Sequence, residues 1–308
     1  MKAMVIREYG GPEVVEHTEV PDPRVGPDSV LVRVRAVGVN PVDRKIREGL
    51  LDGILDVRFP LIMGWDVAGV VQAVGGGVTE FRPGDEVVGY VRKDTVEHGT
   101  YAELVSAPVR TLARKPAALD WAQAGGLPLA GLTAYQALVR TLRVGPGRTV
   151  LVHAAAGGVG SLAVQIATAY GARVIGTASE RNHAYLRGLG AEPVAHGDGL
   201  VDRVRALAPD GVDAVLDLVG GDALDASAQL VRDPAAVASA ADYGVAARGG
   251  HYVWARPDAA DLTELARLAD EGRLRVPVAS TFPLAQAASA QALNAEGRTR
   301  GKIVLLVD

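Results

Sequence analysis

The stretch "LVHAAAGGVGSLAVQIA" at residues 151–167 decides how the second half of this chain folds. An apolar run breaks into small residues and glycines, and apolar residues then resume at helical spacing, which is the pattern of a strand, a tight turn and a helix. Ala155, Gly157 and Gly160 take the three positions of G-x-G-x-x-G. Alanine still allows the tight turn, the second position lets the backbone approach a pyrophosphate, and the third lets the helix pack closely on the strand.

Short apolar runs alternate with Ala-rich helical segments from about Trp121 onwards. The runs are "TVLVHA", "ARVIGTA", "VDAVLDLVG", "AAVASAAD" and "GHYVWA", which begin at residues 149, 172, 212, 235 and 250. Strands that alternate with helices predict βαβ units and an α/β fold with a doubly wound parallel sheet. The helix after the turn would point its N-terminal amides at phosphate groups, so a nucleotide site is favoured over a Gly-rich turn without a ligand.

The end of the next strand, in "ARVIGTASERN" at residues 172–182, indicates which nucleotide binds. An acidic side chain there would bind a ribose 2′-hydroxyl and repel a 2′-phosphate. Residues 177–179 are not acidic, and Arg181 can pair with a phosphate, so NADPH is favoured over NADH. Two alternatives stay open: Glu180 takes the acidic role, or residues 180–182 simply begin a helix capped by Ser179 or Asn182.

The first third of the chain consists of short strands separated by Pro and Gly turns. "MKAMVIREY", "SVLVRVRAVGVN", "VAGVVQAVG" and "DEVVGYV" begin at residues 1, 29, 67 and 85 and predict a mostly β domain. Near the end, "DLTELARLADEG" (261–272) and "PLAQAASAQALNAEG" (283–297) predict helices, and "GKIVLLVD" (301–308) predicts a strand. We expect this last strand to return to the first domain.

Composition narrows the choice of partner and compartment. The 308 residues are 48% hydrophobic, with a formal net charge of -4. Because no block of Lys and Arg is present, we expect neither a nucleic acid nor a membrane surface as partner. The chain has no cysteine, which excludes disulfides and thiolate metal ligands and fits a cytoplasmic location. A Gly-Gly-Pro turn at residues 10–12 argues against a signal peptide or a membrane span at the start.

Five motifs in order carry a resemblance to a known family. They are "NPVDRKIREG" (40–49), "MGWDVAGVVQAVG" (63–75), "LPLAGLTAYQAL" (127–138), "HAAAGGVG" (153–160) and "EGRTRGKIVL" (296–305). Nearly the whole chain resembles the quinone oxidoreductase branch of the medium-chain dehydrogenase/reductase superfamily. The resemblance implies a GroES-like β domain from residues 1–117 and 257–308 around a Rossmann domain of residues 118–256, with NADPH in the cleft between them.

Zinc-dependent alcohol dehydrogenases of the same superfamily hold a catalytic metal with Cys, His and Cys. The matching positions here are Asn40, Trp65 and roughly Leu129, none of which replaces a thiolate or imidazole ligand. We therefore expect a zinc-independent enzyme that gives hydride to a quinone or an α,β-unsaturated carbonyl. The alternatives are a reductase of enoyl thioesters or polyketide intermediates and a non-catalytic NADPH-binding protein.

The resemblance also implies which side chains do the chemistry. Asn40 and Asp43 match a loop beside the nicotinamide, where Asn40 would donate a hydrogen bond to a carbonyl while Asp43 holds the loop or takes part in catalysis. Lys45 stands where some quinone reductases have Tyr, so it is a proton donor, a carbonyl clamp or merely a surface lysine. Trp65 either walls the substrate pocket or packs in the core.

Cofactor contacts follow from the same motif matches. The pyrophosphate turn comprises Ala156, Gly157, Gly158 and Val159, and the adenosine-phosphate end comprises Gly176, Thr177, Ser179 and Arg181. The nicotinamide end comprises Asn40, Thr133, Ala241, Asp242, Val253 and Trp254. Val219, at the end of the fourth strand, is a further cofactor contact. His196 lies against the adenine or is a surface loop residue, and Lys302 reaches the cofactor from the C-terminal segment. The edge strand at 251–254 is expected to pair two copies into a homodimer.

Overall fold

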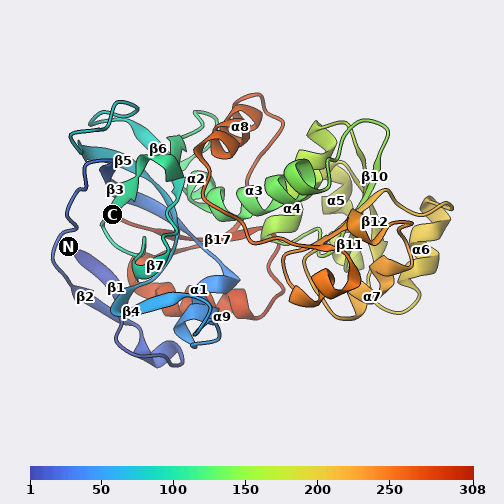
Figure 1. Cartoon of the computed structure of the whole chain (residues 1–308), viewed down its shortest axis with the longest axis horizontal. Coiled ribbons are helices and arrows are strands. Elements are labelled where there is room, and N and C mark those ends of the chain that lie inside the picture. Colours follow the sequence, from blue (N-terminus) through green and yellow to red (C-terminus); the bar gives the residue numbers. More distant parts are fainter. The chain divides into compact units, whose positions relative to one another are not determined.

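The computed structural model describes all 308 residues, which form two compact units. The first unit comprises Met1–Leu132, Arg256–Asp270 and Arg275–Asp308, and the second comprises Thr133–Ala255 and Glu271–Leu274. The expected domain limits at 117 and 257 differ from these mainly over residues 118–132. Helix α2 (Trp121–Gly126) belongs to the first unit because it packs against strands β3, β5 and β17 of that unit (Figure 1).

The first unit contains two sheets. One has the order β16-β17-β3-β5-β6-β9, with β8 also paired to β3, and the other has the order β2-β1-β4-β7. The strands are β1 (Lys2–Ile6), β2 (Glu16–Glu19), β3 (Ser29–Val39), β4 (Asp56–Ile62), β5 (Asp66–Val74), β6 (Glu86–Tyr90), β7 (Thr95–His98), β8 (Leu104–Pro108), β9 (Leu112–Arg114), β16 (Val278–Pro283) and β17 (Lys302–Leu306). Strand β17 pairs with β3, which confirms that the end of the chain completes the first sheet.

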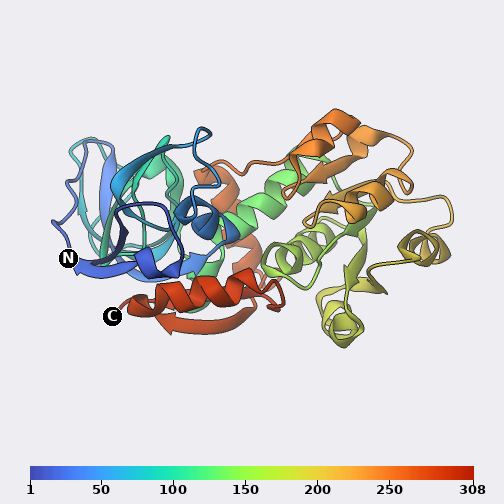
Figure 2. The ribbon, with the colours of Figure 1, turned by 90° about the horizontal axis from the view of Figure 1, so that it is seen from below.

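Helices close the first unit around these sheets. They are α1 (Pro41–Arg47), α2, the start of α3 (Pro128–Tyr135), α8 (Ala259–Asp270), α9 (Ala287–Ala295) and the 3-10 turns η1 (Pro12–Val14), η2 (Val109–Thr111) and η7 (Leu284–Gln286). The two helices predicted near the end of the chain are confirmed as α8 and α9. Figure 2 shows α9 beside the C-terminal strands, and it also contacts α1.

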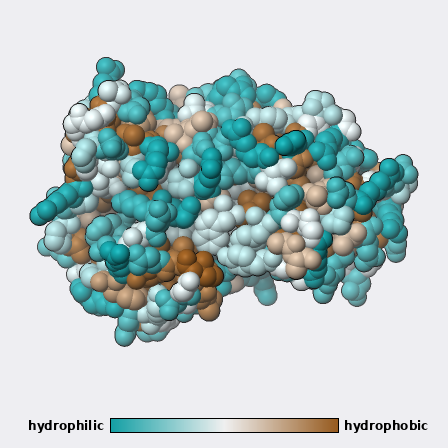
Figure 3. All heavy atoms as spheres, viewed as in Figure 1, coloured by the Kyte–Doolittle hydropathy of each residue, from teal (hydrophilic) through white to brown (hydrophobic).

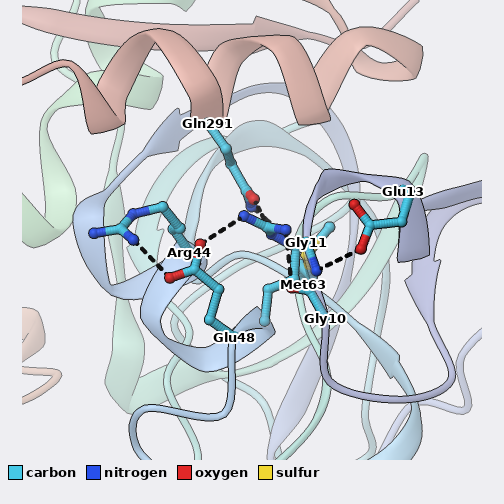
Figure 4. A network of polar contacts seen from close by, with 8 residues as sticks. Gly10, Gly11, Glu13, Arg44, Glu48, Met63 and Gln291 are labelled. Carbon is cyan, nitrogen blue, oxygen red and sulfur yellow. Dashed lines mark hydrogen bonds and ion pairs between the residues drawn. The ribbon is translucent and has the colours of Figure 1, made fainter.

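A buried arginine fixes α1 against α9. Arg47 donates from Nε to Gln291 Oε1 at 2.9 Å, from Nη1 to the Gly10 carbonyl at 3.0 Å and from Nη2 to Glu48 Oε1 at 3.1 Å. Gln291 in turn places its amide nitrogen 3.6 Å from the Met63 sulfur (Figure 4). Because a buried guanidinium group needs hydrogen-bond partners, these three bonds fix the orientation of α1, which Asn40 precedes as the N-cap and whose first turn carries Asp43.

The second unit is built on a parallel sheet with the order β12-β11-β10-β13-β14-β15, the Rossmann order that the sequence pattern predicts. Its strands are β10 (Thr149–Val152), β11 (Arg173–Ala178), β12 (Ala191–Ala195), β13 (Ala214–Asp217), β14 (Val237–Ser239) and β15 (His251–Tyr252). The helical segments are η3 (Gln136–Thr141), α4 (Gly158–Ala169), η4 (Glu180–Asn182), α5 (His183–Leu189), α6 (Leu200–Leu207), α7 (Asp222–Ala228), η5 (Pro234–Ala236) and η6 (Tyr243–Arg248). The buried core of this unit includes apolar side chains from four of the strands, namely Leu151, Ile175, Val215 and Val237.

Three expectations for this sheet need correction. Strand β12 is not among the runs read from the sequence, because "AEPVA" is short and contains a proline. Val219 does not end the fourth strand, because β13 stops at Asp217. The Asp217 side chain accepts a hydrogen bond from the Val219 amide at 2.9 Å, and the chain turns there. The edge strand covers only His251–Tyr252 rather than 251–254, because its partner β14 has only three residues to offer.

The surface in Figure 3 is largely hydrophilic, with a hydrophobic patch where Figure 1 places α1 and β4. The segment between those elements exposes Leu50 and Ile54 to 61% and 60%. None of the helices combines the length and the apolar character that crossing a membrane requires.

Candidate functional site

The sheet of the second unit reverses its strand order between β10 and β13. These two strands are neighbours in the sheet. The chain runs from β10 through β11 to β12 at one edge and then crosses back to β13, on the other side of β10. Such a reversal of strand order leaves a crevice outside the carboxyl ends, where dinucleotides bind in this topology. The "HAAAGGVG" turn follows β10 directly, so it lies at this switch point.

The turn itself is shaped by one unusual backbone conformation and one close approach. Ala154 has a φ of 48°, a left-handed value that is uncommon outside glycine. Its amide donates to Thr177 Oγ1 at 3.1 Å, and the amide of Ala155 donates to the Thr177 carbonyl at 2.9 Å. A Cβ on Gly160 would lie 2.3 Å from the carbonyl oxygen of Ala154, so the third glycine is required by packing.

The other two motif positions behave differently. Gly157 directly precedes α4. A Cβ on it would make one contact within 4 Å, a tight one of 3.3 Å to the Ala154 oxygen, so packing disfavours a side chain here much less than at Gly160. Ala155 is fully buried and fits the first position because Gly176 on β11 lies opposite it: a Cβ on Gly176 would be 2.9 Å from that of Ala155. The turn therefore leads directly into the N-terminus of α4, and helix N-termini bind phosphate groups.

A buried histidine lies beneath the turn. His153 Nε2 is 2.9 Å from Ser227 Oγ, and its Nδ1 is 3.4 Å from Thr177 Oγ1. Ser227 gives its hydroxyl hydrogen to the Ala223 carbonyl, so the histidine must donate from Nε2 and accept at Nδ1. Burial lowers the pKa of His153 to about 4, and the neutral ring thereby supports Thr177, which holds the turn.

At the tip of β11 the chain enters η4 at once, as the helix-start alternative expects. Ser179 lies at the start of this turn, and its Oγ accepts a long 3.4 Å hydrogen bond from Asn182. Glu180 and Arg181 are both exposed. His196 is also exposed, in the loop before α6, where its carbonyl accepts from Arg203 at 3.3 Å.

Residues assigned to the nicotinamide end, together with Val219, lie mainly in the loops after β13 and β14. Val219 is 57% exposed, Ala241 and Asp242 follow β14, and the amide of Val253 donates to the Ser239 carbonyl at 2.8 Å. Trp254 is half-buried. Thr133 is separate from these loops, on α3, with 8% of its surface exposed.

In the first unit, Asn40 is the centre of a buried polar cluster. Its Nδ2 donates to Asp66 Oδ2 at 2.9 Å and to the Gly38 carbonyl at 3.3 Å. Its Oδ1 accepts from Lys302 Nζ at 2.6 Å, and that ammonium also donates to the Val39 carbonyl. Asp66 completes the cluster by accepting the Leu129 amide at 2.7 Å. The amide hydrogens of Asn40 are therefore both engaged, and Lys302 lies inside the unit.

Asp43 extends this cluster along α1. Its Oδ2 accepts from the Asn40 amide and from the Tyr101 hydroxyl, each at 2.8 Å, whereas Oδ1 is buried without a partner. Burial raises the pKa of Asp43 to about 7 and that of Asp66 to about 6. Burial also lowers the pKa of Lys302. The geometry thus places Asp43 as the residue that holds the Asn40 loop.

Lys45 and Trp65 occupy different environments. Lys45 is half-buried on α1, and its ammonium makes no hydrogen bond. Trp65 is only 4% exposed and packs edge-on against Tyr90, with ring centroids 5.9 Å apart.

No group of three or more His, Cys, Asp or Glu side chains that could hold a metal ion is present.

Sequence reasoning missed several residues of these clusters. Asp66 and Tyr101 in the first unit, and Asp217 and Ser239 in the second, are all buried polar side chains in or beside apolar strands. A polar residue inside an apolar run, as in "GWDVAG" and "VLDLVG", is the signal that marks them, since such a group is retained only with hydrogen-bond partners.

Comparisons with known families agree with this architecture. The family model of the alcohol dehydrogenase GroES-like domain matches residues 26–117, and that of the zinc-binding dehydrogenases matches residues 189–305. The quinone oxidoreductase of Pseudomonas aeruginosa is 35% identical over an alignment of 329 residues, which covers 99% of each chain. The chloroplastic NADPH-dependent alkenal/one oxidoreductase of Arabidopsis thaliana is 40% identical over 227 residues, 71% of this chain and 58% of that protein.

A solved structure is similar over the same length. A mycobacterial protein determined in complex with NADPH is 31% identical, with a TM-score of 0.85, and the match covers 99% of this chain and 100% of that one.

Proposed function

Because the chain belongs to the quinone oxidoreductase branch of the medium-chain dehydrogenase/reductase superfamily, we propose that it transfers hydride from NADPH to a quinone or an α,β-unsaturated carbonyl. The observation that carries the proposal is the turn at residues 154–160. A Cβ at its third glycine would lie 2.3 Å from the Ala154 oxygen, whereas at its second the same oxygen, at 3.3 Å, is the one neighbour within 4 Å, so the rest of that backbone is open to a pyrophosphate. Two comparisons support NADPH as the cofactor: one similar structure was determined in complex with NADPH, and one relative is named as NADPH-dependent.

The preference for a 2′-phosphate is supported at the tip of β11. Arg181 is exposed there, free to pair with a phosphate. Glu180, the acidic alternative, is exposed beside it, so two side chains of opposite charge lie next to each other at the strand tip. We assign the phosphate to Arg181, with Thr177 and Ser179 at the strand end and Gly157, Gly158 and Val159 at the pyrophosphate.

The reaction proposed needs no zinc. Asn40, Trp65 and roughly Leu129 match the positions of the metal ligands. Here the Asn40 side chain bridges Asp66 and Lys302, the Leu129 amide donates to Asp66, and Trp65 packs on Tyr90. Quinones and enones accept hydride without a Lewis acid more readily than simple ketones do. Both amide hydrogens of Asn40 are engaged. We therefore assign the hydrogen bond to the substrate oxygen to Lys45, whose ammonium is unpartnered. Asn40 is assigned a structural role, as a fixed wall beside the substrate.

Steady-state NADPH oxidation with quinones, enones and enoyl thioesters tests this function. We expect turnover with quinones or enones and little with thioesters. Preference for thioesters would indicate a biosynthetic reductase on the same scaffold. Tight NADPH binding without turnover of any acceptor would leave a non-catalytic binding protein and overturn the proposal. Dialysis against a zinc chelator should leave the rate unchanged.

We further propose a cytoplasmic homodimer. The cysteine-free composition supports the compartment. For the dimer, β15 is an edge strand with an unpaired side, and beside it Tyr243, 51% exposed, stacks on Tyr252 with ring centroids 3.9 Å apart. Exposed edges with aromatic neighbours invite pairing with a second copy. Light scattering at micromolar concentration should give the mass of two chains, and Tyr243→Asp should lower it; a monomeric mass for the unaltered protein contradicts the dimer.

A further inference from the structure

Asp217 ends β13 at the switch point of the sheet and is completely buried. Its Oδ1 accepts the amides of Val219 at 2.9 Å and Gly220 at 3.0 Å, and its Oδ2 accepts the Ser239 hydroxyl at 2.6 Å. All of these partners donate, so the carboxylate acts only as an acceptor. The loop after β13 therefore turns around one side chain.

Ser239 carries the connection to the next loop. Its hydroxyl hydrogen goes to Asp217, so its oxygen is left to accept, and it accepts the amides of Ala241 at 3.1 Å and Asp242 at 3.0 Å. Ser239 is also completely buried. One hydroxyl thus links the carboxylate under the first loop to the backbone of the second.

A second link joins the two loops at the surface. The side chain of Asp242 accepts the amide of Gly221 at 3.2 Å and that of Gly244 at 2.7 Å. These amide bonds hold the pKa of Asp242 below its usual range. These side-chain bonds add to the backbone bond from the Ala240 amide to the Asp217 carbonyl, at 3.0 Å, and fix the loops after β13 and β14 to each other.

The strand order indicates which half of the cofactor meets these loops. In a Rossmann sheet the pyrophosphate lies at the first turn and the adenosine end lies toward the second strand, here β11. The nicotinamide end must then lie on the other side of the switch point, over β13 and β14. Val219 and Ala241, whose backbone this network fixes, stand at that edge.

We propose that Asp217 and Ser239 are positioning residues, which together fix the two loops that receive the nicotinamide end of the dinucleotide. This inference rests on the proposed NADPH-binding function. Neither side chain touches the cofactor: both act through the backbone amides that they hold. Removing either one should therefore affect the nicotinamide half and leave the adenosine half in place.

The test compares two ligands by calorimetry on the full chain: 2′,5′-ADP, which has only the adenosine-phosphate end, and NADPH. In Asp217→Asn the side-chain NH2 group would face the Ser239 hydroxyl, so two donors would meet where a carboxylate oxygen now accepts. Ser239→Ala removes the hydroxyl that links the two loops. We expect the Kd of NADPH to rise about tenfold or more in each variant and that of 2′,5′-ADP to stay within about twofold. The double variant should be no worse than the more affected single one, because the two residues form one device.

Thr111→Val is the matched control, since it removes another buried hydroxyl, which donates to the Pro108 carbonyl at 2.7 Å; both Kd values should stay as in the unaltered protein. Equal weakening of both ligands in the Asp217 and Ser239 variants, or weakening of neither, overturns the inference. Failure of the proposed reaction is seen separately, as absence of turnover by the unaltered protein, while the ratio of the two Kd values still decides the positioning role.

Discussion

Lys302 donates a 2.6 Å hydrogen bond to the side-chain oxygen of Asn40, although the two residues are 262 positions apart and each is at most 4% exposed. This bond fixes which end of the Asn40 amide faces which neighbour: the oxygen faces the ammonium, and the nitrogen faces Asp66. The last strand of the chain thereby orients a side chain on the loop that leads into α1.

Lys302→Met should destabilise the protein substantially. It removes the cation that favours the charged forms of Asp66 and Asp43 and leaves the side-chain oxygen of Asn40 without its donor. Breaking a buried charged network costs roughly 3 kcal/mol of unfolding free energy, measurable as a lower urea midpoint. Lys45→Met is the control: its ammonium makes no hydrogen bond, so the midpoint should shift by less than about 0.5 kcal/mol. Equal midpoints for the two variants would show that the network contributes nothing.

Burial raises the pKa of Asp43 from its ordinary value of 3.8 to about 7, which predicts a specific pH dependence of the stability. The folded state holds this proton more tightly than the unfolded chain, so the stabilisation is complete below about pH 4 and is lost as the pH rises through about 7. The loss is at most about 4 kcal/mol. Asp43→Asn has no proton to lose, so its unfolding free energy should fall less than that of the unaltered protein over this range.

His153 has the opposite sign, which is why the Asp43 experiment must be read as a difference between two proteins. Its folded pKa is lowered from 6.5 to about 4, so its stabilisation is present above about pH 6.5 and is lost as the pH falls through about 4. Subtracting the curve of Asp43→Asn from that of the unaltered protein cancels this contribution. Parallel curves between pH 4 and 7 would contradict the protonation assigned to Asp43.

The glycines of the turn should separate folding from binding. Gly160→Ala places a methyl group 2.3 Å from the Ala154 oxygen, so we expect a loss of stability of about 1–3 kcal/mol from overpacking. Gly157→Ala makes a tight contact of 3.3 Å with that oxygen, which a shift of a few tenths of an ångström relieves. We therefore expect a smaller loss of stability than for Gly160→Ala, while the Kd of NADPH rises because the methyl group occupies the approach to the pyrophosphate. Thermal melts and calorimetry on both variants test this, and a Gly157→Ala protein that binds NADPH normally would argue against the phosphate site.

The sequence predicted the sheet of the second unit well because its strands are short apolar runs between helices, a pattern that local side chains determine. It failed where pairing partners decide: β12 contains Pro193 and forms only because β11 offers a free edge, and β15 ends where β14 ends. The clusters were harder still. The contacts of Asn40 and Asp43 with Asp66, Tyr101 and Lys302 form only when distant segments of the chain come together, so no local sequence pattern predicts them.

The choice between phosphate and hydroxyl recognition at the tip of β11 depends on two neighbouring exposed residues, Glu180 and Arg181. If Arg181 pairs with the 2′-phosphate, Arg181→Ala should raise the Kd of NADPH about tenfold or more and leave that of NADH unchanged, since a charge-assisted pair is lost only with the phosphorylated cofactor. Glu180→Ala is the matched control and should change neither Kd much, or tighten NADPH slightly by removing a repulsive charge. Were Glu180 instead to bind the ribose hydroxyls, its removal would weaken NADH while Arg181→Ala left NADPH untouched, and the assignment of NADPH through Arg181 would be wrong.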